Sequence, residues 1–266
     1  MATHDIPRLL AFADLLADAA RAAILPYFRA SFTIEHKQGG APFDPVTEAD
    51  RASETAMREM ISREFPEHGV LGEEFALRES QSGYTWVLDP IDGTRAFISG
   101  LPSWGVLIAL TFEGEPILGI MDQPYTDERY RGWNDGADFV GRDGPKTLRV
   151  RPCVSLREAT IMTTDAFLFH GAEATAFQRI REGARLTRYG FDCYAYCMVA
   201  AGHIDGVVES GLKPFDIGAL IPIVRGAGGS VSNWRGASAS GGGQVLASGD
   251  ARVRDEMMVL LKDAAV

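Results

Sequence analysis

Two aspartates, Asp89 and Asp92, are the residues of this sequence whose type and spacing are best suited to chemistry. They directly follow the apolar run 86–88, which is typical of a buried strand. Two carboxylates held this close together repel each other unless a cation lies between them. Because carboxylate oxygens are hard ligands, the pair favours Mg²⁺, Mn²⁺ or Ca²⁺. The alternative is an ordinary polar turn, since turns select the same residue types.

The residues after Asp89 predict a turn that leads into a helix. Pro90 lacks an N–H group, so we expect strand pairing to stop there. Gly93 permits a tight bend, and the apolar spacing that follows predicts a short helix beginning near Thr94. Free N–H groups at a helix N-terminus favour a phosphate. The stretch as a whole therefore predicts a metal-assisted phosphate site.

Three further acids stand where predicted elements begin or end. Asp50 and Asp216 lie in the first turns of two predicted helices, and Glu73 ends a short predicted strand. Such positions are rigid enough to converge on one site. Only one of Glu73 and Glu74 can face that site, because consecutive strand residues point in opposite directions. Asp50 has a competing explanation as a capping acid at its helix N-terminus.

Other common hydrolase chemistries have no motif in the sequence. There is no Gly-x-x-x-x-Gly-Lys loop for nucleotide phosphates and no Gly-x-Ser-x-Gly nucleophile motif. The five histidines are too scattered to predict a zinc hydrolase. Ligation by carboxylates alone points to Mg²⁺.

The overall composition is that of an acidic globular protein. The chain has 266 residues, of which 46% are hydrophobic, and this is enough for a substantial core. A net charge of −10 argues against a general nucleic-acid or anionic-membrane binder. An anionic substrate would therefore need bound cations to reverse the local potential.

The cysteines and the N-terminal residues predict a soluble cytoplasmic protein. Three cysteines do not make a disulfide framework, and we interpret Cys193 and Cys197 as core residues. The first residues contain neither a basic nor an apolar segment, so no signal peptide is expected. The longest uncharged stretch, 96–112, is interrupted by glycine and proline and is short for a bilayer span.

Strands that alternate with helices, together with hairpins, predict mixed sheets in one compact unit. The elements predicted in residues 1–150 are a helix over 5–29, a strand over 32–37, a helix from about 47 to 61, strands over 70–74 and 86–88, a short helix from 94, a hairpin of 104–110 with 117–121, and short strands around 130 and 139. Those predicted in residues 151–266 are strands over 160–164, 185–189, 204–209, 230–232 and 245–247, and helices over 172–181, 192–201, 213–226 and 250–262. No linker separates these two halves.

Four motifs in order carry a resemblance to a known family. They are DPVTEAD at 44–50, GEE at 72–74, DPIDGT at 89–94, and KPFDIGA at 213–219 with the glycine-rich 226–229 after it. In order and spacing the chain resembles the inositol monophosphatase superfamily over nearly its whole length. The resemblance implies an α+β fold of layered αβαβα type. It also implies a lithium-sensitive, Mg²⁺-dependent phosphomonoesterase that is usually a homodimer.

Within that family the chain looks like the histidinol-phosphate phosphatases of the inositol-monophosphatase type. The segments that carry this likeness are 95–102, 192–196 and 211–214, although Phe191 stands where that subgroup often has glycine. The likeness implies substrate-binding roles for Arg95, Asp192 and Glu209. Carboxylates at 192 and 209 would pair with the ammonium or imidazole of histidinol phosphate. The alternatives are that Asp192 is an ordinary helix N-cap and Glu209 a solvated strand end.

The resemblance also implies a role for each residue of the predicted metal and phosphate site. Glu73, Asp89 and the Ile91 carbonyl would hold one Mg²⁺, and Asp89, Asp92 and Asp216 a second, with a third, weaker ion near Glu73. Thr94, hydrogen-bonded to Asp50, would orient or deprotonate a water activated by metal, and the N–H groups of Gly93 and Thr94 would hold phosphate oxygens. The role of Lys37 is left open.

Two alternative functions are kept. The first is the same chemistry on inositol monophosphate, a sugar bisphosphate or a 3′-phosphoadenosine nucleotide. The second is a non-catalytic interaction protein, for which the loss of a metal ligand would be the expected sign.

Overall fold

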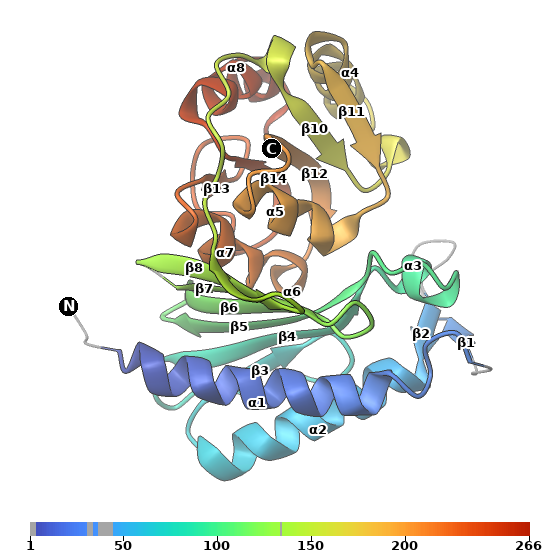
Figure 1. Cartoon of the computed structure of the whole chain (residues 1–266), viewed down its shortest axis with the longest axis vertical. Coiled ribbons are helices and arrows are strands. Elements are labelled where there is room, and N and C mark those ends of the chain that lie inside the picture. Colours follow the sequence, from blue (N-terminus) through green and yellow to red (C-terminus); the bar gives the residue numbers. More distant parts are fainter. Residues whose placement is uncertain (1–3, 31–33, 37–44, 134) are drawn as a thin grey trace.

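Helices and sheets alternate in layers through the molecule, in the order helix, sheet, helix, sheet, helix (Figure 1). The computed structural model describes residues 4–30, 34–36, 45–133 and 135–266. The arrangement confirms the α+β fold of αβαβα type. Among the described residues, no helix is long and apolar enough to cross a membrane.

The larger sheet carries the central motif. In the described part of the chain it has seven strands in the order β3-β4-β5-β6-β7-β8-β9. These are β3 (Gly69–Gly72), β4 (Tyr84–Asp92), β5 (Gly105–Phe112), β6 (Glu115–Gln123), β7 (Glu128–Trp133), β8 (Gly136–Gly141) and β9 (Gly144–Thr147). Only β3 and β4 are parallel in this described sheet. A separate antiparallel pair joins β1 (Ile34–His36) and β2 (Pro45–Thr47).

Two amphipathic helices, α1 (Ile6–Ile24) and α2 (Glu48–Glu64), cover one face of this sheet. Their apolar faces and the sheet residues beneath them form one hydrophobic core. Asp5 caps α1, because its Oδ1 accepts from Arg8 N at 3.3 Å. The helix ends earlier than predicted, since Pro26 has no N–H to extend the ladder.

The smaller sheet comes from residues after 159. Among the described residues it has five strands in the order β11-β10-β12-β14-β13. These are β10 (Thr160–Thr163), β11 (Leu186–Tyr189), β12 (Gly206–Leu212), β13 (Ser230–Ser232) and β14 (Gly243–Ser248). The outer helices α4 (Ala172–Gly183) and α8 (Ala251–Leu261) pack on its far side with the short 3-10 helices η1 (Leu156–Glu158), η2 (Ala166–Leu168) and η3 (Lys262–Ala264).

Helices α5 (Asp192–Ala200), α6 (Pro214–Ile217) and α7 (Leu220–Gly226) fill the layer between the sheets. Their apolar side chains join residues of both sheets in a single core. The continuous helix predicted over 213–226 is wrong, because the chain forms α6 and α7 with a break between them. Pro222 accounts for the break, since it cannot donate to the carbonyl of Gly218.

Strand β4 continues past the proline that was expected to end it. It reaches Asp92, and its pairing with β5 shifts register between Asp89 and Asp92. Pro90 is tolerated because an irregular position in the ladder needs no N–H donor there. The prediction that pairing stops at Pro90 is therefore wrong, and the irregularity brings both aspartates to the end of one strand.

A buried ion-pair group fastens α1 to the larger sheet. Asp122 on β6 is fully buried. Its carboxylate accepts from Arg21 Nη2 at 2.9 Å and from Arg129 Nε at 2.8 Å. Arg21 also pairs with Asp127, whose side chain is 61% exposed.

We expect Asp122→Ala to destabilise the protein by about 3–5 kcal/mol, because it leaves two partly buried arginines without their shared partner. Asp127→Ala is the matched control, since an exposed pair contributes about 1 kcal/mol or less. Urea unfolding of the two variants and the parent measures both values. Equal effects of the two substitutions would contradict the structural role of Asp122.

Candidate functional site

The end of β4 and the start of α3 (Thr94–Ile98) form a turn that presents the central aspartates. Ile91 N donates to Asp89 Oδ1 at 3.1 Å, and the Thr94 hydroxyl donates to the Ile91 carbonyl at 3.1 Å. Gly93 has φ of 85°, a left-handed conformation that glycine adopts without steric cost. The turn therefore packs the side chains of Asp89, Asp92 and Thr94 around one stretch of backbone.

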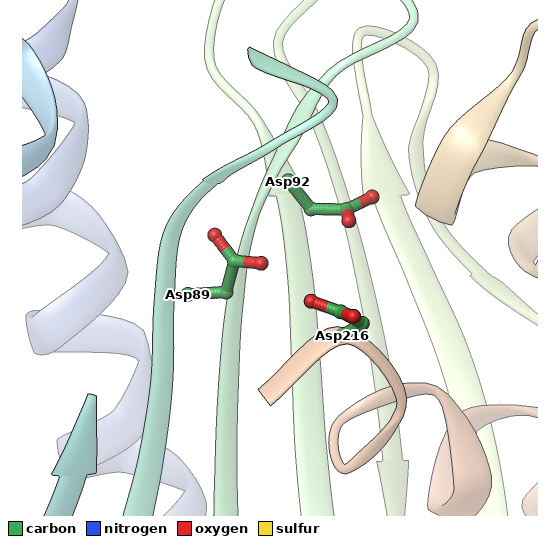
Figure 2. A group of neighbouring side chains, drawn as sticks. All are labelled: Asp89, Asp92 and Asp216. Carbon is green, nitrogen blue, oxygen red and sulfur yellow. The ribbon is translucent and has the colours of Figure 1, made fainter. Parts of the chain in front are cut away.

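Asp216 joins the two aspartates from the other half of the chain. It lies in the first turn of α6, where its Oδ2 accepts from Lys213 N at 2.6 Å. One carboxylate oxygen each from Asp89, Asp92 and Asp216 lies within 4.8 Å of the other two. Figure 2 shows the three side chains pointing toward one another. This geometry suits a hard divalent cation.

The electrostatics of the three aspartates favour a bound cation. Burial raises the pKa of Asp89 well above its usual value, and the charges of four other acids raise it further: Glu73, Asp92, Asp216 and Asp50. Burial also raises the pKa of Asp92, as do the charges of Asp192 and Asp216. Buried carboxylates that repel one another are stabilised either by protons or by a metal ion. The donor set therefore fits the hard divalent metal that the sequence predicted.

Glu73, in the bend directly after β3, and Asp50, on α2, approach the same cluster. After burial, the charge of Glu73 is the largest cause of the raised pKa of Asp89. Asp50 is 2% exposed in the first turn of α2 and contributes to the same shift. Glu74 instead pairs with Arg51, with 3.9 Å between Oε2 and Nε. The two neighbouring glutamates thus face different surroundings.

Asp192 lies directly beside the phosphate-binding turn expected at Gly93. A Cβ added to Gly93 would stand 3.1 Å from Asp192 Oδ2. Asp192 has φ of 41°, an unusual value for a residue other than glycine. Burial raises its pKa to about 6, while the charge of Arg95 and a hydrogen bond with Thr164 lower it.

Glu209 is buried on β12, so the alternative of a solvated strand end is wrong. Its Oε1 accepts from Thr164 N at 2.6 Å. Its Oε2 is buried without a hydrogen-bond partner among the described residues, as is the hydroxyl of Tyr196. Burial raises the pKa of Glu209 to about 8, hydrogen bonds with Thr164 lower it, and the charge of Asp192 raises it.

Two contacts in this region were not singled out from the sequence. Cys193 N, at the start of α5, donates to Asp92 Oδ2 at 2.7 Å, and Thr164 interacts with both Asp192 and Glu209. The only signal for Thr164 was its place at the end of a predicted strand. Lys37 and the first residue of the 44–50 motif lie outside the described residues.

The comparisons with known proteins agree with one another on the family. The model of the inositol monophosphatase family matches residues 5–263. The chain is 42% identical to the chloroplastic bifunctional phosphatase IMPL2 of Arabidopsis thaliana over 87% of its own length and 66% of that protein's. It is 36% identical to a histidinol-phosphatase of Chlorobaculum parvum, covering 88% of each chain. The solved structure of an inositol monophosphatase from Zymomonas mobilis superposes with a TM-score of 0.86 at 40% identity, covering 98% of this chain and 100% of that one.

Proposed function

This chain belongs to the inositol monophosphatase family of phosphatases, and we propose that its substrate is L-histidinol phosphate, which it hydrolyses to L-histidinol and phosphate with Mg²⁺ as cofactor. The observation that carries the substrate proposal is the position of Asp192 and Glu209. Asp192 lies beside the turn at Gly93, and its charge raises the pKa of Asp92 and also that of the buried Glu209.

The candidate metal ligands would hold two Mg²⁺ ions, with a third bound more weakly. Asp89, Asp92 and Asp216 would supply carboxylates to one ion, and Glu73, Asp89 and the Ile91 carbonyl would supply the other. The observations that support this set are the 4.8 Å cluster and the charge of Glu73 at Asp89. The chemistry supplied by bound Mg²⁺ is acidification of a water and neutralisation of developing charge.

The turn between β4 and α3 would bind the phosphate group. The N–H groups of Gly93 and Thr94 would donate to phosphate oxygens, as at other helix N-termini. The Thr94 hydroxyl, now donating to the Ile91 carbonyl, would orient the attacking water and pass its proton toward Asp50. Thr94 and Asp50 both lie in the first turn of a helix, and these rigid positions support a role in orienting the water.

The acids at 192 and 209 would recognise the leaving group. At neutral pH a pKa of about 6 leaves Asp192 largely ionised, whereas a pKa of about 8 leaves Glu209 mostly protonated. Asp192 would therefore carry the negative charge that pairs with an ammonium or imidazolium, and Glu209 would add a hydrogen bond. Arg95 would set the position of the Asp192 carboxylate.

Neutralising Asp192 is expected to lower activity selectively on the cationic substrate. A charge-assisted hydrogen bond contributes about 1.5–3 kcal/mol, so kcat/KM of Asp192→Asn for histidinol phosphate should fall roughly 10- to 150-fold. Activity on inositol 1-phosphate should change little, because the metal ligands and the turn at Gly93 are intact. The measurement is the ratio of kcat/KM for the two esters in each enzyme.

Asp165→Asn is a control for that experiment, since Asp165 caps η2 by accepting from Phe167 N at 2.9 Å. An equal loss on both esters in Asp192→Asn would show that Asp192 is structural.

The proposed function itself is tested by phosphate release from histidinol phosphate and inositol 1-phosphate side by side. We expect turnover of histidinol phosphate with Mg²⁺, none after chelation, and inhibition by Li⁺. Faster turnover of inositol 1-phosphate would favour the second candidate, an inositol monophosphatase. That candidate is supported by the likeness to the Zymomonas mobilis enzyme. The homodimer is a separate prediction, which light scattering on the purified protein would test.

A further inference from the structure

A cavity lies between α5 and the outer strands of the larger sheet. Its volume is about 490 Å³, within the range of sites for small ligands. The residues that line it are Glu128, Tyr130, Phe139, Asp143, Lys146, Thr147, Leu148, Arg149, Tyr194, Met198, Ala201 and His203. None of them belongs to the acid cluster described above.

One carboxylate stands among the aromatic side chains of this cavity. Glu128 Oε2 accepts from the Tyr194 hydroxyl at 2.5 Å and from the Tyr130 hydroxyl at 3.4 Å. Burial raises the pKa of Tyr194, and its hydrogen bond to Glu128 raises it further, so the hydroxyl stays protonated and donates. Both contacts fall on Oε2, and no described residue donates to Oε1. Glu128 therefore has an acceptor atom left for a bound cation.

The cavity walls beside Glu128 also suit a cation with an apolar body. The rings of Tyr130 and Phe139 have centroids 4.8 Å apart, and those of Tyr130 and Tyr194 are 6.0 Å apart, edge to face. An ammonium group near such rings gains electrostatic attraction to their faces. Leu148 and Met198 add apolar surface for the remainder of a ligand.

One exposed residue of the lining, Arg149, carries the opposite charge. Lys146 pairs with Asp143 at 3.2 Å, so these two largely offset each other. Arg149 and His203 are exposed and line the same cavity, and Arg149 forms no ion pair with a described residue. A guanidinium is well suited to bind a carboxylate through two hydrogen bonds. The cavity thus offers a carboxylate among its rings and a guanidinium at its exposed side.

Helix α5 connects the cavity to the metal-ligand candidates. Tyr194 contacts Glu128 in the cavity, while the preceding residue, Cys193, donates its N–H to Asp92 at 2.7 Å. Asp192, Cys193 and Tyr194 are the first three residues of α5. A ligand that moves Tyr194 would therefore act on the first turn of the helix that contacts the active site.

We propose that this cavity is a regulatory site for a small zwitterionic α-amino acid, with its ammonium at Glu128 and its carboxylate at Arg149. Occupancy would alter phosphatase activity through the first turn of α5. This site is separate from the proposed active site and goes beyond the proposed function. Binding of the amino acid can therefore be measured with no phosphate ester present.

The binding test begins with a thermal-shift screen of the twenty L-amino acids at millimolar concentration. We expect at least one to raise Tm, and calorimetry then gives its Kd. The matching amine without the carboxylate and the matching acid without the ammonium should each bind about 10-fold more weakly or worse, as for the loss of a charge-assisted hydrogen bond. Failure of every amino acid to bind would overturn the proposal.

Two variants locate the bound amino acid. Glu128→Gln removes the carboxylate charge that would pair with the ammonium of the ligand, and Met198→Trp fills the cavity. If one variant fails to fold, the other still tests the site. Both should weaken binding at least about 10-fold. Glu67→Gln, at an exposed glutamate before β3, is the matched control and should bind like the parent. Binding unchanged in both cavity variants would place the ligand elsewhere and overturn the proposal.

The regulatory part is tested by kcat/KM with and without the amino acid, on whichever phosphate ester the enzyme hydrolyses. Coupling between two sites changes an equilibrium affinity by typically about 5- to 150-fold, and an effect on KM in this range is expected in the parent. The same addition should change nothing in Glu128→Gln. Binding at the cavity with no effect on activity in the parent would overturn the regulatory role.

Discussion

Replacing Asp89 with asparagine is expected to lower kcat by on the order of 10³ or more, because several kcal/mol of charge stabilisation by metal is lost. Asp89 is the carboxylate that both metal ions would share. It is also 1% exposed. The measurement is kcat at saturating Mg²⁺.

The same substitution is expected to leave the metal-free protein as stable as the parent or more stable. Burial and neighbouring acids raise the pKa of Asp89, so the folded parent binds a proton there more tightly than the unfolded chain does. The stability that this proton contributes is present at low pH and is lost as pH rises through the raised pKa. Asparagine has no such proton to lose.

Thermal unfolding between about pH 5 and pH 8, with chelator and then with Mg²⁺, tests this second expectation. The advantage of Asp89→Asn over the parent without metal should grow with pH, and Mg²⁺ should raise Tm more in the parent. Asp263→Asn, at an exposed aspartate near the C-terminus, should behave as the parent does. Near-parental turnover of Asp89→Asn at saturating Mg²⁺ would refute the two-metal proposal.

Thr94→Ala is expected to lower kcat by roughly 10²–10⁴, the usual range for a lost acid–base participant. KM should change little, because the backbone N–H of residue 94 survives the substitution. Steady-state kinetics on the preferred ester measures both constants.

Thr94→Ser is the matched variant, since it retains a hydroxyl that can donate to the Ile91 carbonyl as Thr94 does at 3.1 Å. It should recover most of the activity. A large rise in KM at unchanged kcat in Thr94→Ala would show instead that Thr94 only helps to bind phosphate.

The local features of the site could be predicted from the sequence because they depend on neighbours in the chain. The strand, turn and helix around Asp89 and Asp92 follow from an apolar run, a glycine and helical spacing, and all three are present. Asp216 was expected in a first helical turn and lies there, held by Lys213 N three residues away. Such bonds within a turn are decided by short segments.

Predictions from local sequence were wrong where a residue's surroundings depend on contacts with a distant segment of the chain. The expectation that β4 ends at Pro90 used the missing N–H alone, whereas β5 continues to pair beyond it through a register shift. Glu209 looked like a possible solvated strand end, yet it is 1% exposed beneath other elements. Burial is a property of packing, so residue type could not reveal it.

The order of residues shows which acids are available and on which kind of element each one stands. Which of these acids lie close together depends on how the layers of the fold pack. Thr164 N and Glu209 are 45 residues apart, and Cys193 N and Asp92 are 101 apart, yet both pairs are hydrogen-bonded. The physical reason is that a buried carboxylate must find donors or opposite charge wherever the packed layers bring them, and sequence spacing carries no record of that partner.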